Sequence, residues 1–106
     1  NDKAQRIEVK STLLCLSGDA WKAQFRDVKF GEFDVLLLAL TTPRAIHVMK
    51  YNTTRKPFVS TTGKCVSGAT INIFGRHHAD ILTSADDILK KLTLLGCEYL
   101  YRIDFD

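Results

Sequence analysis

The sequence predicts an α+β (mixed α/β) domain in which a mixed sheet of about five or six strands carries one clear helix. Several segments alternate polar and apolar residues as strands do, one near-continuous apolar run has the length of a buried strand, and one late segment has helical periodicity. The 106 residues are 45% hydrophobic and 25% charged, which excludes collagen, low-complexity disorder and a multidomain enzyme. We expect residues 1–106 to form one domain, and no apolar run approaches the ~20 residues of a membrane span.

The expected strands are separated by turn residues. Residues 6–11 alternate charged and apolar side chains, so Ile7 and Val9 are expected to face the core. Segments 33–40 and 45–51 flank a proline-containing turn, which predicts an antiparallel hairpin. The other expected strands are residues 21–26, 69–74 and 98–105.

The helix is expected over residues 85–95. Ser84 is a good N-cap, Asp87 three positions later completes a capping box, and Gly96 is placed to end the helix. One apolar stripe runs along it, formed by Ile88, Leu89, Leu92 and Leu95. This stripe predicts a helix packed on one face of the sheet.

The basic residues are distributed unevenly. Residues 41–79 contain six Lys or Arg residues and no Asp or Glu, while the rest of the chain is net acidic. This asymmetry predicts a surface for a polyanion such as nucleic acid, with a solvated basic face as the alternative. A long polar segment, 52–68, is the expected recognition element. The candidate nucleic-acid-binding residues are Gln24, Arg55, Lys56, Lys64, Arg76 and His77.

Neither the cysteines nor the histidines have the spacing of a metal site. Cys15, Cys65 and Cys97 are odd in number and far apart, which predicts free thiols and a cytoplasmic location. His77 and His78 are adjacent, so on a strand they would point to opposite faces and would not share one ion.

Glu8 and Lys10 are the strongest catalytic candidates. Two positions apart on a strand, they share one face at a spacing of about 6.6 Å. Such a pair can hydrolyse a phosphodiester bond. The carboxylate suits Mg²⁺, with the Val9 carbonyl as a further ligand, and the ammonium would orient or activate the water that attacks the phosphate. Alone, such a tripeptide is more often a surface ion pair worth a few tenths of a kcal/mol.

Four segments in the first half of the chain form a recognisable series: IEVKST at 7–12, WKAQF at 21–25, FDVLLLAL at 33–40 and IHVMKY at 46–51. Together they resemble the PD-(D/E)xK nuclease superfamily and, within it, type II restriction endonucleases. The resemblance covers roughly residues 5–51 and implies a restriction-endonuclease-like fold and Mg²⁺-dependent cleavage of double-stranded DNA. It implies Glu8 as a metal ligand, Lys10 as the catalytic lysine, and a homodimer that cuts both strands.

The family's first acid has no clear counterpart. Only Asp2 precedes Glu8 as an acid, and Asn1 rather than proline precedes Asp2. The first acid is therefore expected on a missing N-terminal portion, with a partner chain, a degenerate site, or Asp2 as a weak substitute left open. Two other functions stay open: a noncatalytic nucleic-acid-binding or structural subunit on the same fold, and an interaction domain with a fortuitous Glu–Lys pair. RNA is not excluded as the substrate.

Overall fold

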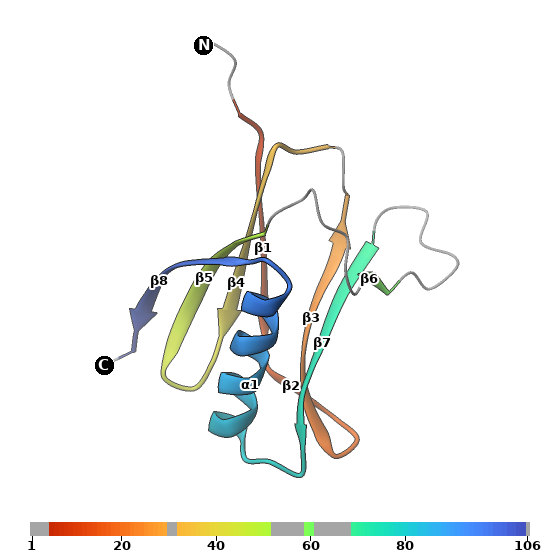
Figure 1. The fold of residues 1–106 in the computed structure, drawn as a ribbon, viewed down its shortest axis with the longest axis vertical. Coiled ribbons are helices and arrows are strands. Elements are labelled where there is room, and N and C mark those ends of the chain that lie inside the picture. Colours follow the sequence, from red (N-terminus) through yellow and green to blue (C-terminus); the bar gives the residue numbers. More distant parts are fainter. Residues whose placement is uncertain (1–4, 30–31, 52–58, 61–68, 106) are drawn as a thin grey trace.

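The computed structural model describes residues 5–29, 32–51, 59–60 and 69–105, which form an α+β fold of two sheets and one helix (Figure 1). The first sheet has the strand order β1-β4-β5-β8. It is mixed, because β1 and β4 are parallel whereas β4 and β5, and β5 and β8, are antiparallel. The second sheet, β2-β3-β7-β6, is antiparallel. In chain order the elements are β1 (Ile7–Leu13), β2 (Cys15–Ser17), β3 (Ala20–Val28), β4 (Val35–Thr41), β5 (Ala45–Tyr51), β6 (Val59–Ser60), β7 (Ala69–His77), α1 (Ile81–Leu94) and β8 (Glu98–Asp104).

The predicted hairpin is confirmed, and the predicted single sheet is corrected. β4 and β5 pair antiparallel, and the Thr42 amide donates to the Ala45 carbonyl at 2.9 Å across the turn. The strands are divided between two sheets because β3 pairs with β7 and β2 rather than with β1 or β4. Alternation along a strand marks its two faces but not its partner, so the sequence pattern did not separate the sheets.

The core lies between the two sheets and the helix. β4 and β5 of the first sheet, β3 and β7 of the second, and α1 all contribute buried side chains to one cluster, so the helix closes the space between the sheets (Figure 1). The largest fully buried hydrophobic side chains are Phe25, Val28, Leu36, Leu38, Leu40, Met49, Ile71, Ile88 and Leu92. Among the described residues, no helix is long and apolar enough to cross a membrane.

The helix begins one turn earlier than its sequence signature predicts. Asp80 is the N-cap, and its carboxylate accepts a hydrogen bond from the Thr83 amide at 2.8 Å. Ser84, the expected cap, is fully buried within the helix. Its Cβ lies so close to Gly75 of β7 that a Cβ placed there would be 2.8 Å away. Ser84 is therefore a contact residue between helix and strand, and the expected capping box with Asp87 is wrong.

The helix end is confirmed in detail. Gly96 has a φ of 99°, a left-handed conformation that glycine adopts without the strain of a side chain. The Gly96 amide donates to the Thr93 carbonyl at 3.0 Å, and the Cys97 amide donates to the Leu92 carbonyl at 3.1 Å. This pair of bonds is the Schellman motif, so Gly96 ends the helix as its position predicts.

Two of the three cysteines lie in the described part of the chain, and both are free thiols. Cys15 is exposed, whereas Cys97 is buried in the core. Burial raises the pKa of the Cys97 thiol to about 11. Cys97 is therefore protonated near neutral pH and acts as a packing residue rather than a nucleophile.

The orientation of β1 is the reverse of the prediction. Ile7 and Val9 are 59% and 57% exposed, while Glu8 and Lys10 are half-buried on the opposite face. The reason is the register with β4, which pairs Glu8 with the fully buried Leu36 and so turns the charged residues toward the interior. A shift of one residue would exchange the two faces of the strand.

Candidate functional site

Glu8 and Lys10 form an ion pair on the inner face of β1. The carboxylate Oε2 and the ammonium Nζ are 3.4 Å apart, and the two side chains are 44% and 23% exposed. Lys10 pairs in register with Leu38 of β4, so its alkyl stem runs beside the core while its ammonium faces a pocket. This placement holds the predicted pair on a rigid element, on one face of the strand.

The pocket beside this pair contains acidic residues that the sequence analysis did not single out. It has a volume of about 150 Å³, and its described lining residues are Glu8, Lys10, Asp27, Lys29, Glu32 and Phe33. Asp27 comes from the end of β3, and the Glu32 amide donates to the Lys29 carbonyl at 3.1 Å. The pocket thus brings three carboxylates and two ammonium groups to one place. We name it the Glu8–Lys10 pocket.

Asp27 reaches the pocket through an irregularity in β3. Its φ is 59°, in the left-handed region, and the pairing of β3 with β7 shifts register between Phe25 and Val28. A bulge of this kind re-aims side chains and is common next to functional sites. The only local sequence signal was an acid and a lysine two positions apart at 27 and 29, the same spacing as Glu8 and Lys10.

The donor chemistry of the pocket suits Mg²⁺, although it offers no dedicated cage. Mg²⁺ is usually bound by one or two carboxylates together with water and substrate phosphate. Glu8 and Asp27 offer such carboxylates from two neighbouring strands. Among the described residues, no group of three or more His, Cys, Asp or Glu side chains is arranged to hold a metal ion. Val9, whose carbonyl was a predicted ligand, lies between Glu8 and Lys10 with its side chain on the outer face.

The described candidates for nucleic-acid contact lie away from this pocket. Gln24 and Arg76 share the outer face of the second sheet, opposite the buried side chains of β3 and β7. His77 pairs with Ala20, at the far end of β3 from Asp27, a separation of about 23 Å along the strand. Other predicted residues lie outside the described part of the chain, namely Asp2, Arg55, Lys56 and Lys64, as does nearly all of the expected recognition segment 52–68.

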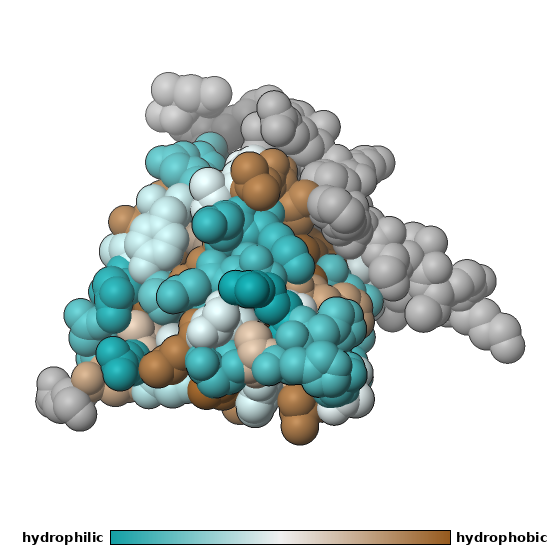
Figure 2. All heavy atoms as spheres, turned by 60° about the horizontal axis from the view of Figure 1, so that its bottom comes forward, coloured by the Kyte–Doolittle hydropathy of each residue, from teal (hydrophilic) through white to brown (hydrophobic). Residues whose placement is uncertain are grey.

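The two adjacent histidines do not point to opposite faces as predicted. His78 leaves the strand with a φ of 60°, so both imidazoles reach Asp19 in the β2–β3 turn, each with an N···O distance of 3.2 Å. The hydrogen bond from His77, and then the charge of His78, lower the pKa of the Asp19 carboxyl. Figure 2 shows hydrophilic side chains gathered over this end of the molecule. These contacts join two turns of the second sheet, and His77 is engaged within the protein.

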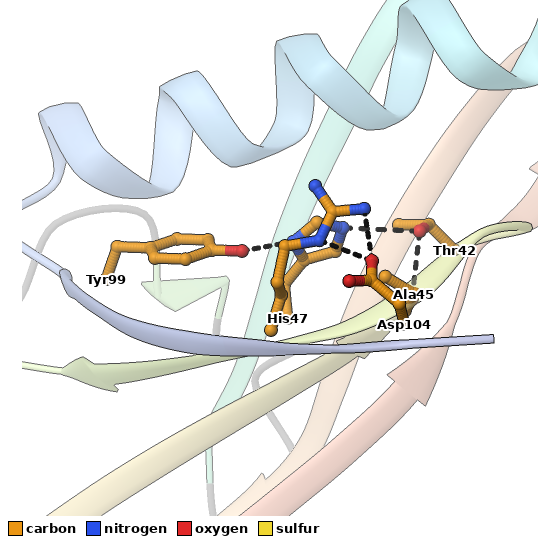
Figure 3. Close-up of polar contacts among 6 residues, drawn as sticks. Thr42, Ala45, His47, Tyr99 and Asp104 are labelled. Atoms are coloured by element: carbon orange, nitrogen blue, oxygen red, sulfur yellow. Dashed lines mark hydrogen bonds and ion pairs between the residues drawn. The ribbon is translucent and has the colours of Figure 1, made fainter. Parts of the chain in front are cut away.

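A second polar cluster surrounds His47, which is 7% exposed on β5 (Figure 3). The Thr42 hydroxyl donates to the Ala45 carbonyl at 2.9 Å, so it can only accept from His47 Nε2, which lies 3.3 Å away. Neutral His47 therefore carries its proton on Nε2. Its Nδ1 accepts from the Tyr99 hydroxyl at 2.6 Å. The bonds run in one direction from β8 through β5 to the β4–β5 turn.

We expect His47 to make the protein less stable as the pH falls from 7 to 5. Burial, and then the charge of Arg102, lower the pKa of His47 below its ordinary 6.5, although Asp86 and Asp104 oppose this. The unfolded chain then binds the proton more readily, so stability is full above about pH 6.5 and declines below it. Urea unfolding at several pH values would measure this decline.

Replacing His47 by glutamine provides the control, because glutamine does not titrate. The wild-type protein should lose more stability than His47→Gln over the same pH range. NMR titration of His47 in the wild-type protein gives an independent readout, with a pKa below 6.5 expected. A pKa above that value would contradict the lowering by burial and by the charge of Arg102.

Comparison with known proteins identified no relative of this chain. No protein-family model, no curated protein and no solved structure matches the chain. The Glu8–Lys10 pocket and the arrangement of charges around it are therefore the basis on which we infer a function.

Proposed function

We propose that the chain is a Mg²⁺-dependent endonuclease that hydrolyses phosphodiester bonds in double-stranded DNA, on a restriction-endonuclease-like fold. The observation that supports this most is the orientation of β1. The strand leaves Ile7 and Val9 exposed while turning Glu8 and Lys10 inward, next to a polar pocket. The opposite orientation would bury apolar area and leave both charges in water, which is the lower-cost arrangement for a purely structural strand.

Three residues of the pocket have a role in this proposal. Glu8 is a metal ligand, and Asp27 takes the part of the family's first acid, so that neither Asp2 nor a partner chain is needed to complete the pair of carboxylates. Bound Mg²⁺ would lower the pKa of a water ligand and stabilise negative charge on the phosphate. The Lys10 ammonium donates hydrogen bonds that orient the attacking water and offset charge developing on the phosphate oxygens.

The test is cleavage of supercoiled plasmid by the purified chain in Mg²⁺, in Ca²⁺ and in EDTA. We expect nicking in Mg²⁺ alone and its loss in Glu8→Gln. Calorimetric measurement of Mn²⁺ binding gives a readout that does not depend on activity. The affinity for Mn²⁺ should be lower in the same variant. Wild-type protein that neither cuts DNA nor binds Mn²⁺ would refute the proposal.

A noncatalytic nucleic-acid-binding subunit is the second candidate. It is favoured by the ion pair itself, since Lys10 already contacts Glu8 at 3.4 Å, and by the lack of a three-residue metal group among the described residues. DNA binding that persists in EDTA, without cleavage in Mg²⁺, would support this second candidate instead.

A further inference from the structure

The outer face of the second sheet carries three cations. Lys22 pairs in register with Phe74 and Gln24 with Asn72, and all four lie opposite the buried Ala23, Phe25, Ile71 and Ile73. Two further cations lie on this face: Arg26, which donates to the Gln24 side chain at 2.8 Å, and Arg76, two positions beyond Phe74. We call these six residues the cationic face: Lys22, Gln24, Arg26, Asn72, Phe74 and Arg76.

The three cations of this face have no ion-pair partner among the described residues. In the described part of the chain, no carboxylate lies within 4.0 Å of the charged groups of Lys22, Arg26 or Arg76, whereas Lys10 and Lys91 each form an ion pair. Gln24 accepts both Arg26 bonds, at 3.1 Å and 2.8 Å, and holds the guanidinium in place without cancelling its charge. The face therefore complements a polyanion.

A mostly apolar groove adjoins the cationic face and shares two residues with it. The groove has a volume of about 400 Å³ and lies between β7 and the C-terminal half of α1. Phe74, whose side chain is partly exposed, forms part of its wall, and the Lys91 ammonium donates to the Phe74 carbonyl at 2.6 Å. Its described lining residues are Asn72, Ile73, Phe74, Lys91, Leu94 and Leu95.

We propose that the cationic face and this groove together bind single-stranded nucleic acid. Phosphates contact Lys22, Arg26 and Arg76, and an unstacked base lies against Phe74 in the groove. Charge alone would accept duplex DNA, but an aromatic ring beside an apolar groove is useful only to a base that has left its stack. An open sheet face also offers no helix or two-stranded ribbon to enter a duplex groove.

This site is separate from the proposed nuclease centre. None of the six residues of the cationic face lines the Glu8–Lys10 pocket. Binding can therefore be measured in EDTA and with the Lys10→Met variant, so that its outcome does not depend on whether the chain cleaves DNA. Failure of the proposed nuclease activity would leave this inference intact, and the reverse also holds.

The first experiment measures fluorescence anisotropy of labelled oligo(dT), oligo(U) and a mixed-sequence duplex of equal length. We expect both single strands to bind more tightly than the duplex. Replacing Lys22, Arg26 and Arg76 together by glutamine should lower the salt slope of log K by about 2, because three phosphate contacts are lost. Arg44→Gln, an exposed cation on the β4–β5 turn, is the matched control and should leave the slope nearly unchanged.

The second experiment tests the groove. Phe74→Ala should weaken single-strand binding roughly 5- to 150-fold through loss of base stacking. Phe105→Ala is the matched control, since Phe105 is 47% exposed and Phe74 45%, and it should bind as the wild type does. Equal affinity for duplex and single strand, or unchanged binding by Phe74→Ala, would overturn the inference. Circular dichroism of each variant shows whether a loss of binding is a loss of fold.

Discussion

Lys10→Met is expected to lower the rate of Mg²⁺-dependent cleavage by roughly 10²- to 10⁴-fold, the range seen when a proton-transfer group or a charge-stabilising donor is removed. Methionine keeps the unbranched stem that packs beside β4 but has no ammonium to orient water or offset phosphate charge. Single-turnover cleavage of saturating plasmid would isolate the chemical step. DNA affinity should change little, because one of many positive charges is lost.

The control is the other ammonium of the same pocket. Lys29 lines the pocket with Lys10 but lies beyond the end of β3, so Lys29→Met should reduce cleavage far less. Asp27→Asn tests the second carboxylate in the same assay and should resemble Glu8→Gln. Retained cleavage in Lys10→Met together with its loss in Lys29→Met would transfer the lysine's role to Lys29 and contradict the proposal.

The sequence was sufficient to predict the elements that depend on contacts between residues close together in the chain. The β4–β5 hairpin follows from two apolar segments around a proline turn, and the helix end follows from Gly96, which adopts the positive φ that its position requires. The helix start was misplaced because two capping residues lie four positions apart. Asp80 precedes Thr83, which supplies the bonded amide, while Ser84 has the right chemistry but a buried position.

Strand partners and strand orientation depend on contacts between distant residues. The alternation at 6–11 correctly places Glu8 and Lys10 on one face, but which face turns inward is set by the register with β4, about 28 residues away. Asp27 enters the pocket only because β3 passes beside β1 and bulges near its end. No residue spacing within β1 or β3 indicates that the two strands lie side by side. The sequence therefore predicted the Glu8–Lys10 pair but not Asp27 beside it.

Leu38→Ala is expected to reduce the free energy of unfolding by about 2–5 kcal/mol, the cost of deleting a well-packed buried leucine and leaving a cavity. Leu38 lies at the centre of β4 and is fully buried. Its side chain is on the same face of the first sheet as Glu8 and Lys10. Urea unfolding at neutral pH, monitored by circular dichroism, would measure the change in stability.

Leu13→Ala on the neighbouring strand makes the same chemical change on the opposite face of the same sheet. Leu13 is 62% exposed, so its truncation should cost less than about 1 kcal/mol, while the weaker strand propensity of alanine acts on both variants alike. The difference between the two variants thus reports which face of the first sheet is buried. Equal losses, or a larger loss at Leu13, would show that the outer face is the packed one and that Glu8 and Lys10 do not share a face with the core.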